Sequence, residues 1–259
     1  MLSGDCFLFI TFGHQNTNRM DSLRNKKVII LGGSSGIGLA VAKAVSADGA
    51  EVTIVSSNQE RIDSALEQLP KSAKGRAVNL ADEDQIATLF NTIDKFDHLL
   101  FTAGENLQIN SIANTSLSDA KNFFEVRFWG AFAAVKYAAP NINPGGSIVL
   151  TGGCAAHRPG SGWSLVASVF SAMEGFVRAM AIELAPIRVS LVVPGLVKTE
   201  LWAGMDTTER EEMFVHFSKL LPVKYVAPAE DVSETYLHLI KQKYITGQTV
   251  IVDGGFVLV

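Results

Sequence analysis

The stretch with the clearest chemical potential is rich in glycine and serine and lies between a β-branched run, residues 28–31, and a helical run, residues 39–46. A glycine-rich turn that leads from a strand into a helix leaves the first N–H groups of the helix unpaired, and these groups bind phosphate. The strand-turn-helix context therefore predicts a pyrophosphate loop, whereas the alternative is an ordinary glycine-rich turn. The residues expected to form the loop are Gly32, Ser34, Ser35, Gly36, Ile37 and Gly38.

The residues after the second predicted strand, residues 51–55, indicate which dinucleotide would bind. A carboxylate at this place accepts hydrogen bonds from the ribose 2′-hydroxyl of NAD. Ser56, Ser57 and Asn58 stand there instead, and their hydroxyl and amide groups can donate to a 2′-phosphate. We therefore predict NADP(H) as the cofactor, and we expect Arg61, one turn further on, to face solvent.

Several later segments complete a known pattern in its usual order. Thr102-Ala103-Gly104 ends a predicted strand, Pro194-Gly195-Leu196-Val197-Lys198-Thr199 ends another, and Val252-Asp253-Gly254-Gly255 lies near the C-terminus. With the Gly-x-x-x-Gly-Ile-Gly spacing of the first loop, they resemble the short-chain dehydrogenase/reductase family from Asn25 onward. The resemblance implies further cofactor contacts at Asn79, Leu80, Thr102, Ala103, Gly104, Pro194, Gly195, Val197 and Thr199.

The composition fits one large globular domain. The chain has 259 residues, of which 47% are hydrophobic and 19% charged. Predicted strands and helices alternate with short loops, so we predict an α/β fold with a Rossmann-type doubly wound parallel sheet in a single domain, residues 20–259. Residues 1–19 are apolar in part but lack a basic segment before the apolar run, so we expect a flexible N-terminal extension rather than a signal peptide.

The charge and the cysteines exclude several classes of partner. A net charge of −4 argues against nucleic acid, which requires a basic surface. The two cysteines, Cys6 and Cys154, form neither a disulfide framework nor metal-ligand spacing, so we expect no metal and a reduced, cytoplasmic compartment. No uninterrupted run of about 18 apolar residues is present, so we expect no membrane span.

The family resemblance also implies a catalytic Asn–Ser–Tyr–Lys tetrad, and this sequence carries none of the four residues. Arg127 stands at the Asn position, and Gly153, or Gly152 if the loop shifts by one residue, stands at the Ser position. Val166 and Phe170, four apart on a predicted helix, replace the Tyr that acts as acid and base and the Lys that lowers its pKa. No tyrosine in the chain is followed four residues later by lysine, so an ordinary carbonyl reductase is excluded.

The loss of the acid restricts the reaction, because general acid catalysis contributes about 10²–10⁴-fold to such reductions. An iminium ion develops no oxyanion and needs no proton. We therefore predict an oxidoreductase of specialised metabolism that reduces an iminium or a similarly activated double bond and can also direct a cyclisation of the product. The alternatives are a non-redox cyclase or isomerase in the same scaffold and a catalytically silent cofactor-binding partner or regulator.

Arginine at the Asn position is similar to the pattern of the fungal reductase/Diels–Alderases of indole alkaloid biosynthesis, which derive from the same family. That resemblance implies NADP(H) binding, reduction of a cyclic iminium and control of a later cycloaddition. Those proteins pair the arginine with an aspartate in the loop before the active-site helix, whereas residues 157–163 of this chain contain no carboxylate.

Arg127 is the candidate catalytic residue, because a buried guanidinium must be paired and could hold a substrate carbonyl, an enolate or the cofactor. A cation beside an iminium is repulsive, so a carboxylate should screen it, and Glu105 is the nearest candidate by motif. A purely structural salt bridge is the alternative. Cys154 and His157 lie three apart in an irregular loop, and we expect Cys154 to be a small buried residue rather than a nucleophile.

Aromatic residues and methionines predict an apolar pocket for a bulky small-molecule substrate. The predicted pocket residues are Trp129, Gly153, Trp163, Val166, Phe170 and Trp202. The expected lid, residues 199–221, adds Met205, Met213, Phe214, Phe217 and Leu220. The alternative is that these side chains belong to the core or to an interface. The segments 123–139 and 164–184 are apolar on most faces, and the family resemblance implies that they pair in a homodimer or homotetramer.

Overall fold

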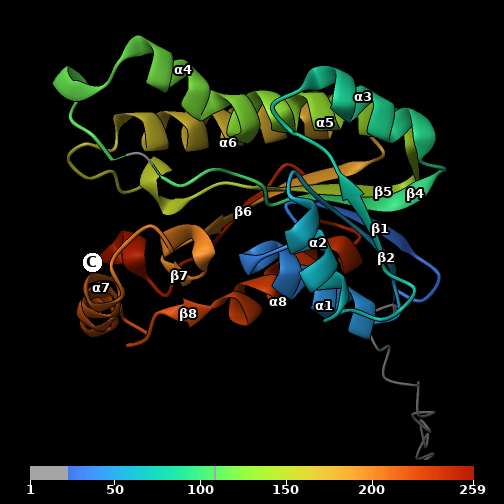
Figure 1. Ribbon diagram of the computed structural model, residues 1–259. Coiled ribbons are helices and arrows are strands. Elements are labelled where there is room, and N and C mark those ends of the chain that lie inside the picture. The colour runs from blue at the N-terminus through green and yellow to red at the C-terminus, as the bar shows by residue number, and fades with distance from the viewer. Residues whose placement is uncertain (1–22, 108) are drawn as a thin grey trace, which may run out of the picture.

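The computed structural model of the chain describes residues 23–107 and 109–259, so the predicted extension at residues 1–19 lies outside the described residues. Strands and helices alternate along the chain (Figure 1). The main strands are β1 (Lys27–Leu31), β2 (Glu51–Ser56), β3 (Lys74–Ala77), β4 (Phe96–Phe101), β5 (Ile142–Thr151), β6 (Arg188–Pro194) and β9 (Thr249–Val252). The helices are α1 (Gly36–Ala47), α2 (Gln59–Leu66), α3 (Glu83–Thr92), α4 (Leu117–Phe124), α5 (Ala131–Ala138), α6 (Ser164–Glu183), α7 (Thr207–Leu220) and α8 (Ala229–Lys241).

The seven main strands form one parallel sheet in the order β3-β2-β1-β4-β5-β6-β9. Helices α1, α2 and α8 cover one face, and α3, α5 and α6 cover the other (Figure 1). Each face has its own apolar core. All six residues of β4 are buried, as expected for a strand covered on both sides. The predicted doubly wound parallel sheet is confirmed.

The strand order reverses between β1 and β4, which are neighbours in the sheet although β2 and β3 separate them along the chain. A ligand of such a sheet binds outside the carboxyl ends of the strands at this reversal. The segments that follow β1, β4 and β5 therefore surround one crevice. A small two-stranded sheet lies apart from the main sheet: β7 (Val197–Lys198) precedes the lid helix α7, and β8 (Ala227–Pro228) follows it (Figure 1).

The predicted helix over residues 123–139 is interrupted. A π-helical segment, η2 (Glu125–Gly130), separates α4 from α5. Gly130 ends this segment against the carbonyl oxygen of Leu80, where a Cβ atom would overlap that oxygen. A π-helical turn holds an extra residue and changes the direction in which its side chains point, and such turns are frequent at functional sites. Arg127 lies in its middle.

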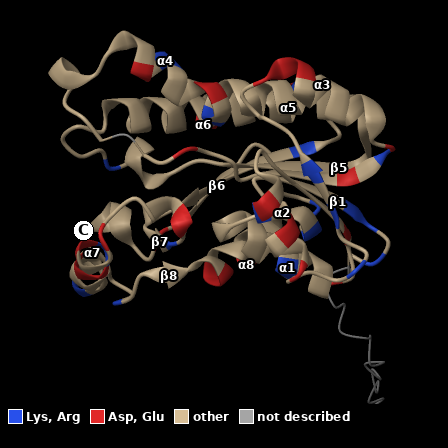
Figure 2. Ribbon diagram, viewed as in Figure 1, with Lys and Arg blue, Asp and Glu red and all other residues tan. Residues whose placement is uncertain are grey.

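Helix α6 is more apolar than the sequence criterion suggested. It has 20 residues and contains an 18-residue window with a mean hydropathy of 1.5, which by length and composition alone is enough to cross a bilayer. Core helices also pass this test, and α6 packs along β5, β6 and the short helix η4 (Cys154–Ala156). Figure 2 shows α5 and α6 largely without charged residues, whereas α3 and α7 carry several. The packing of α6 in a two-sided sheet explains the apolar character of its inner face.

A buried polar pair joins β4 to β5. His98 Nδ1 lies 2.8 Å from the Ser147 hydroxyl, and both side chains are almost fully buried. Burial disfavours the charged imidazole and lowers the pKa of His98 to about 4, with the nearby carboxylate of Asp97 opposing this shift and the cations of Arg188 and Lys26 adding to it. His98 is therefore neutral at physiological pH.

Candidate functional site

The glycine turn between β1 and α1 is shaped to receive a phosphate. A Cβ atom at Gly38 would overlap the carbonyl oxygen of Gly32 and lie 2.5 Å from the Thr102 hydroxyl. That hydroxyl donates to the carbonyls of Leu31 and Gly32 at 3.1 and 3.2 Å, which ties the end of β4 to the turn. Ser35 is the N-cap of α1 but its hydroxyl makes no capping bond, and no acidic residue lies in the first turn. The helix N-terminus fits a pyrophosphate.

The end of β2 carries polar groups and no carboxylate. Ser57 and Asn58 are exposed, and Ser56 is partly exposed. The Asn58 side-chain oxygen accepts from the Arg61 backbone N–H at 2.9 Å and caps α2, so only its NH₂ group can donate to a ligand. Arg61 itself is exposed, as expected. Asn79 likewise uses its side-chain oxygen locally, accepting from Ala81 N–H at 3.1 Å.

The four positions of the family tetrad, Arg127, Gly153, Val166 and Phe170, are occupied by one packed group. The Phe170 ring covers Gly153 so closely that a Cβ atom there would lie 2.7 Å from Cδ2 of the ring. Val166 and Phe170 are buried in one cluster with Phe123, against which Trp163 packs. A serine at position 153 would therefore force the Phe170 ring to move, and none of the four side chains offers a hydroxyl. The sequence prediction that they lie together is supported.

Arg127 extends from the π-helical segment into this group, and its side chain is only 12% exposed. Its Nη2 donates to the backbone carbonyl of Glu105. Its Cζ lies 5.5 Å from the centroid of the Phe123 ring and 5.7 Å from that of Phe170, within the range of cation–π attraction. Its Nε is buried without a hydrogen bond. Burial lowers the pKa of Arg127 to about 10 while Glu105 opposes this shift, so the guanidinium stays charged at neutral pH.

The predicted screening carboxylate is present. Glu105 Oε2 lies 4.0 Å from Arg127 Nε, and the Glu105 side chain is 44% exposed. Gly104 permits this arrangement, because a Cβ atom on it would lie 2.5 Å from Arg127 Nη1. The loop after β4 and the π-helical segment therefore form one unit. The next residue, Asn106, approaches Gly204 of the lid segment, with its Nδ2 3.7 Å from where a Cβ atom would be.

The lid forms a second apolar cluster. Phe214 of α7 is buried with Leu221 and Val226, and Trp202 and Phe217 pack against them. The Trp202 indole donates to the Val197 carbonyl at 2.9 Å, which joins the start of the lid to β7. Among the other predicted lid residues, Met213 also packs in this cluster, Met205 is partly buried and Leu220 is exposed.

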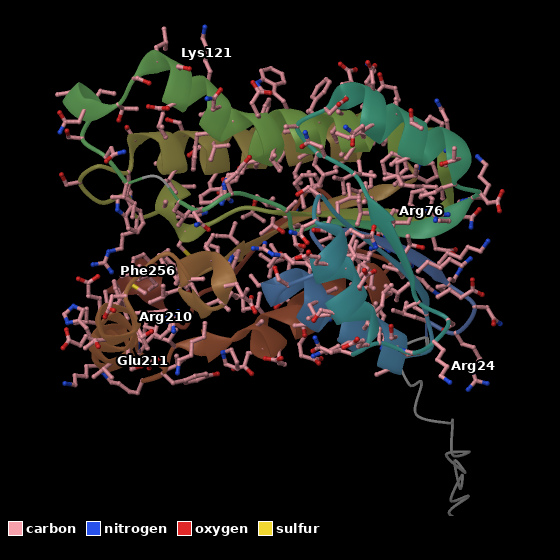
Figure 3. All side chains as sticks on the ribbon, viewed as in Figure 1. Arg24, Arg76, Lys121, Arg210, Glu211 and Phe256 are labelled. Atoms are coloured by element: carbon pink, nitrogen blue, oxygen red, sulfur yellow. The ribbon has the colours of Figure 1, made fainter. Side chains whose placement is uncertain are left out.

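The C-terminal turn touches both walls of the crevice. The Phe256 ring lies 6.0 Å from that of Phe217, and Arg158 Nη1 donates to the Phe256 carbonyl at 2.6 Å. Figure 3 labels Phe256 in the same part of the view as the lid-helix residues Arg210 and Glu211. The lid and the loop after β5 are therefore joined through the C-terminus.

Trp129 does not join the other predicted pocket residues. It is 53% exposed, and its ring lies 5.0 Å from Phe128 and 6.2 Å from Phe132. Phe132 in turn packs on Phe176 of α6 at 5.5 Å. The structure therefore places Trp129 in an aromatic cluster on the surface of α5 and α6, separate from Trp163, because the π-helical segment carries it to that side.

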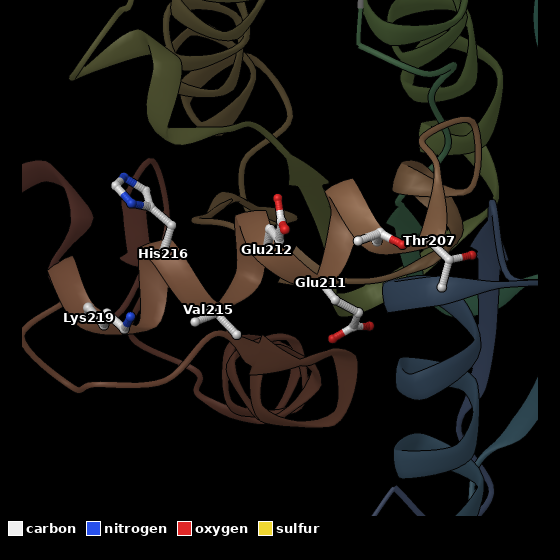
Figure 4. A pocket seen from close by; sticks show the side chains of 7 residues that line it. Thr207, Glu211, Glu212, Val215, His216 and Lys219 are labelled. Carbon is white, nitrogen blue, oxygen red and sulfur yellow. The ribbon is translucent and has the colours of Figure 1, made fainter.

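Two surface grooves lie near the lid and the loop after β5. One, of about 380 Å³, is lined by Ser111, Ile112, Pro159, Gly160, Ser161, Gly162, Trp163, Ser164 and Ala167. The other, of about 530 Å³, runs along a single face of α7 and is lined by Thr207, Thr208, Glu211, Glu212, Val215, His216 and Lys219 (Figure 4). Neither includes a residue of the glycine turn. Trp163 connects the first groove to the tetrad positions.

Several contacts could not be found from the sequence. His157 Nε2 lies 2.7 Å from Glu174 Oε1, so the loop before α6 obtains a carboxylate from the helix itself. Cys154 lies 3.8 Å from the Asp253 carboxylate. Cys154 is buried, as predicted, and burial together with this carboxylate raises the pKa of its thiol to about 12, which disfavours the thiolate that a nucleophile requires. Among the described residues, no group of three or more His, Cys, Asp or Glu side chains could hold a metal ion.

Known proteins resemble the chain along nearly its whole length. A sequence profile of the SDR-like Rossmann domain matches residues 19–259. The short-chain dehydrogenase/reductase fsr5 of Gibberella fujikuroi is 33% identical over 92% of this chain and 97% of its own length. The structure of the MalC reductase/Diels-Alderase from Malbranchea aurantiaca is 30% identical, with a TM-score of 0.86 over 93% of this chain and 99% of MalC. A small-chain dehydrogenase in complex with NADPH is 33% identical, with a TM-score of 0.81 over 91% of this chain and 100% of that protein.

Proposed function

The chain belongs to the short-chain dehydrogenase/reductase family, and on that premise we propose that it is an NADPH-dependent oxidoreductase of specialised metabolism. Its substrate is an electrophile that accepts hydride without a proton from the enzyme, an iminium or a similarly activated double bond. Similarity to MalC, and to a dehydrogenase that binds NADPH, supports this proposal.

The observation that carries the proposal is the contrast within the crevice. The turn that would hold the pyrophosphate keeps its glycines, and no Ser35 side-chain bond caps the helix that follows it. The four tetrad positions hold no hydroxyl, and Phe170 fills the space that a serine would need. A ketone substrate would lose the acid, which contributes about 10²–10⁴-fold. Such a site suits a substrate whose reduction neutralises charge.

Bound NADPH would supply hydride to the iminium carbon and become NADP⁺, and the C=N π electrons would become the nitrogen lone pair. Trp163, Val166 and Phe170 exclude water from that side of the crevice, and the lid cluster around Phe214 covers the other. Arg127 holds the loop after β4 through the Glu105 carbonyl, which fixes one wall. With that wall rigid and water excluded, a bulky product could be held in the folded conformation that a cyclisation requires.

Calorimetric titration with NADPH and with NADH tests the cofactor assignment. We expect micromolar binding of NADPH and much weaker binding of NADH, because Ser56, Ser57 and Asn58 donate to a phosphate and present no carboxylate to a 2′-hydroxyl. Failure of both to bind would remove redox chemistry and favour a cofactor-free scaffold. Tight binding of NADH alone would contradict the assignment of the phosphate site.

Deuteride transfer tests the reaction. NADPH labelled at the transferable position of C4 should deliver its deuterium to the carbon of a cyclic iminium. Cofactor binding without transfer would instead support the alternatives, a non-redox cyclase or isomerase or a silent cofactor-binding protein.

We also propose that the protein forms a homodimer or homotetramer through α5 and α6. Trp129 and Phe132 of the aromatic cluster are exposed, Phe176 beneath them is partly buried, and Ile182 of α6 is 82% exposed. An exposed apolar patch of this kind is typical of an interface. Trp129→Glu together with Phe132→Glu should yield monomers in sedimentation experiments, and unchanged assembly would exclude this surface.

A further inference from the structure

The two side chains of the Arg127–Glu105 pair differ in how far they are exposed to solvent. The Arg127 side chain is 12% exposed and the Glu105 side chain is 44% exposed, so the cationic member of the pair is buried and the acidic member is the more accessible one. The two Phe rings that flank the guanidinium cover it further. A molecule entering the crevice therefore meets the carboxylate before it meets the cation.

The place of Glu105 in the fold puts that carboxylate at the crevice. It is the first residue after Thr102-Ala103-Gly104, at the carboxyl end of the strand beside the topological reversal, where ligands of such sheets bind. Its neighbour Asn106 approaches Gly204 of the lid segment. Glu105 thus lies between the wall formed by Arg127 and the segment that covers the crevice.

The surroundings suit a cation. The Arg127 Nη2 bond holds the Glu105 backbone, and the guanidinium faces Oε2 at 4.0 Å, too far for a full hydrogen bond. The carboxylate therefore keeps acceptor capacity for a ligand. Trp163 and Trp202, both only partly buried, belong to the two clusters on either side, and aromatic faces attract cations.

We propose that Glu105 is the residue that recognises the positive charge of the substrate, with Arg127 as the positioning residue that holds its loop. The ligand class is a planar organic cation with nitrogen as the charged atom, an iminium ion or its aromatic analogue. This inference deepens the proposed function and rests on it for the identity of the reaction. The charge recognition itself is a binding property and can be measured without turnover.

The test compares two ligands of nearly the same shape. N-methylisoquinolinium carries a permanent positive charge, whereas isoquinoline at pH 8 is neutral, and with NADP⁺ as the bound cofactor neither ligand can be reduced. Binding of each is measured by calorimetry to the full chain saturated with NADP⁺. We expect the wild-type protein to prefer the cation by at least tenfold. Glu105→Gln should abolish that preference by weakening cation binding about tenfold, while binding of the neutral ligand changes less than twofold.

A matched control is Glu234→Gln, which removes the same charge from an exposed position on α8. It should leave the preference unchanged. Glu105→Asp keeps the charge and should retain a measurable preference, which a merely structural role of the side chain would not predict. Equal binding of both ligands by the wild type, no binding of either, or a preference that survives in Glu105→Gln would each overturn the proposal.

Turnover separates this inference from the proposed function. The wild type, NADPH and N-methyl-3,4-dihydroisoquinolinium are assayed beside the neutral electrophile 2-cyclohexen-1-one. A preference for the bound cation without reduction of either substrate would support Glu105 recognition and contradict the reductase. Reduction of the neutral enone by a protein that shows no preference for the cation would support the reductase and contradict charge recognition by Glu105.

Discussion

The two sides of the crevice have kept different amounts of the family pattern. On the nucleotide side, the turn from Gly32 to Gly38 and the Thr102 hydroxyl interlock through main-chain contacts. On the catalytic side, Arg127, Gly153, Val166 and Phe170 have replaced the tetrad together, and each now packs against another. The nucleotide side depends on backbone that few residues can build, whereas the catalytic side depends on side chains that can change as a group.

The first prediction concerns a substitution that disrupts the glycine turn on the nucleotide side. Gly38→Val should weaken NADPH binding at least 100-fold, because its Cβ would overlap the Gly32 carbonyl oxygen and force the turn open. Calorimetry measures the binding, and circular dichroism measures folding.

The matched control for Gly38→Val is Gly175→Ala on α6, where a Cβ atom meets nothing within 4 Å. It should keep NADPH binding and add up to about 1 kcal/mol of stability, as alanine does in exposed helix positions. If a folded Gly38→Val protein binds NADPH normally, the phosphate loop is wrongly assigned.

The second prediction concerns His98, which lies on β4 and contacts Ser147 of β5. The folded pKa of His98 is about 4, below the ordinary value of 6.5. Between pH 6.5 and pH 4, His98 is therefore protonated in the unfolded chain but not in the folded protein. The contribution of neutral His98 to the free energy of unfolding is fully present above pH 6.5 and decreases as the pH falls toward 4. The loss amounts to about 3 kcal/mol at and below the folded pKa.

Urea unfolding at several pH values measures this loss. His98→Gln removes the titrating group and should flatten the dependence between pH 6.5 and 4, while carboxylates such as Asp97 continue to contribute at lower pH. An unchanged slope in the variant would mean that another group causes the acid sensitivity.

The third prediction tests whether the catalytic side changed as a group. Gly153→Ser should cost about 2 kcal/mol, because the new side chain overlaps the Phe170 ring. In a Phe170→Leu background the same serine should cost less than half as much. Thermal unfolding of the four proteins in this cycle measures the coupling, and strict additivity would contradict it.

The same reasoning bears on restoring a ketone reductase. Val166→Tyr with Phe170→Lys alone should give at most faint activity, because the new ammonium would lie beside the buried Arg127 guanidinium. Adding Arg127→Asn and Gly153→Ser should increase NADPH-dependent reduction of a simple ketone. No gain in a folded fourfold variant would count against the alignment of these positions.

The smallest expected effect concerns cofactor choice. Ser57→Asp places a carboxylate after β2 and should weaken NADPH binding about tenfold relative to NADH, which corresponds to about 1.4 kcal/mol. Ser64→Asp adds the same charge at an exposed position of α2 and serves as the control. Competition titrations of the two cofactors give the ratio, and equal shifts in both variants would show a general charge effect.

Local signals in the sequence were sufficient for the nucleotide side. The strand over residues 28–31 and the helix over residues 39–46 lie within β1 and α1, because β-branched residues and a glycine turn determine this unit within a few residues. The sequence also grouped Arg127, Gly153, Val166 and Phe170, which the structure packs together, and it named Glu105 as the carboxylate near Arg127. Each of these predictions used spacing relative to a motif.

Contacts between distant segments could not be predicted in the same way. The π-helical segment depends on Gly130 meeting the Leu80 carbonyl, and it turns Trp129 away from the predicted pocket. The approach of Cys154 to Asp253 joins residues 99 positions apart. A pattern of neighbouring residues does not show which distant segments will come into contact.

The sequence by itself determined the fold, the loop for a dinucleotide and the loss of the proton donor, because glycine positions, strand-helix alternation and missing residue types are local properties. Only the tertiary structure decided that the Phe170 ring occupies the space beside Gly153, that the Arg127 side chain is buried and that the Glu105 side chain stays partly exposed. These outcomes depend on how segments pack across the crevice, since burial and the direction of an ion pair arise only when distant residues meet.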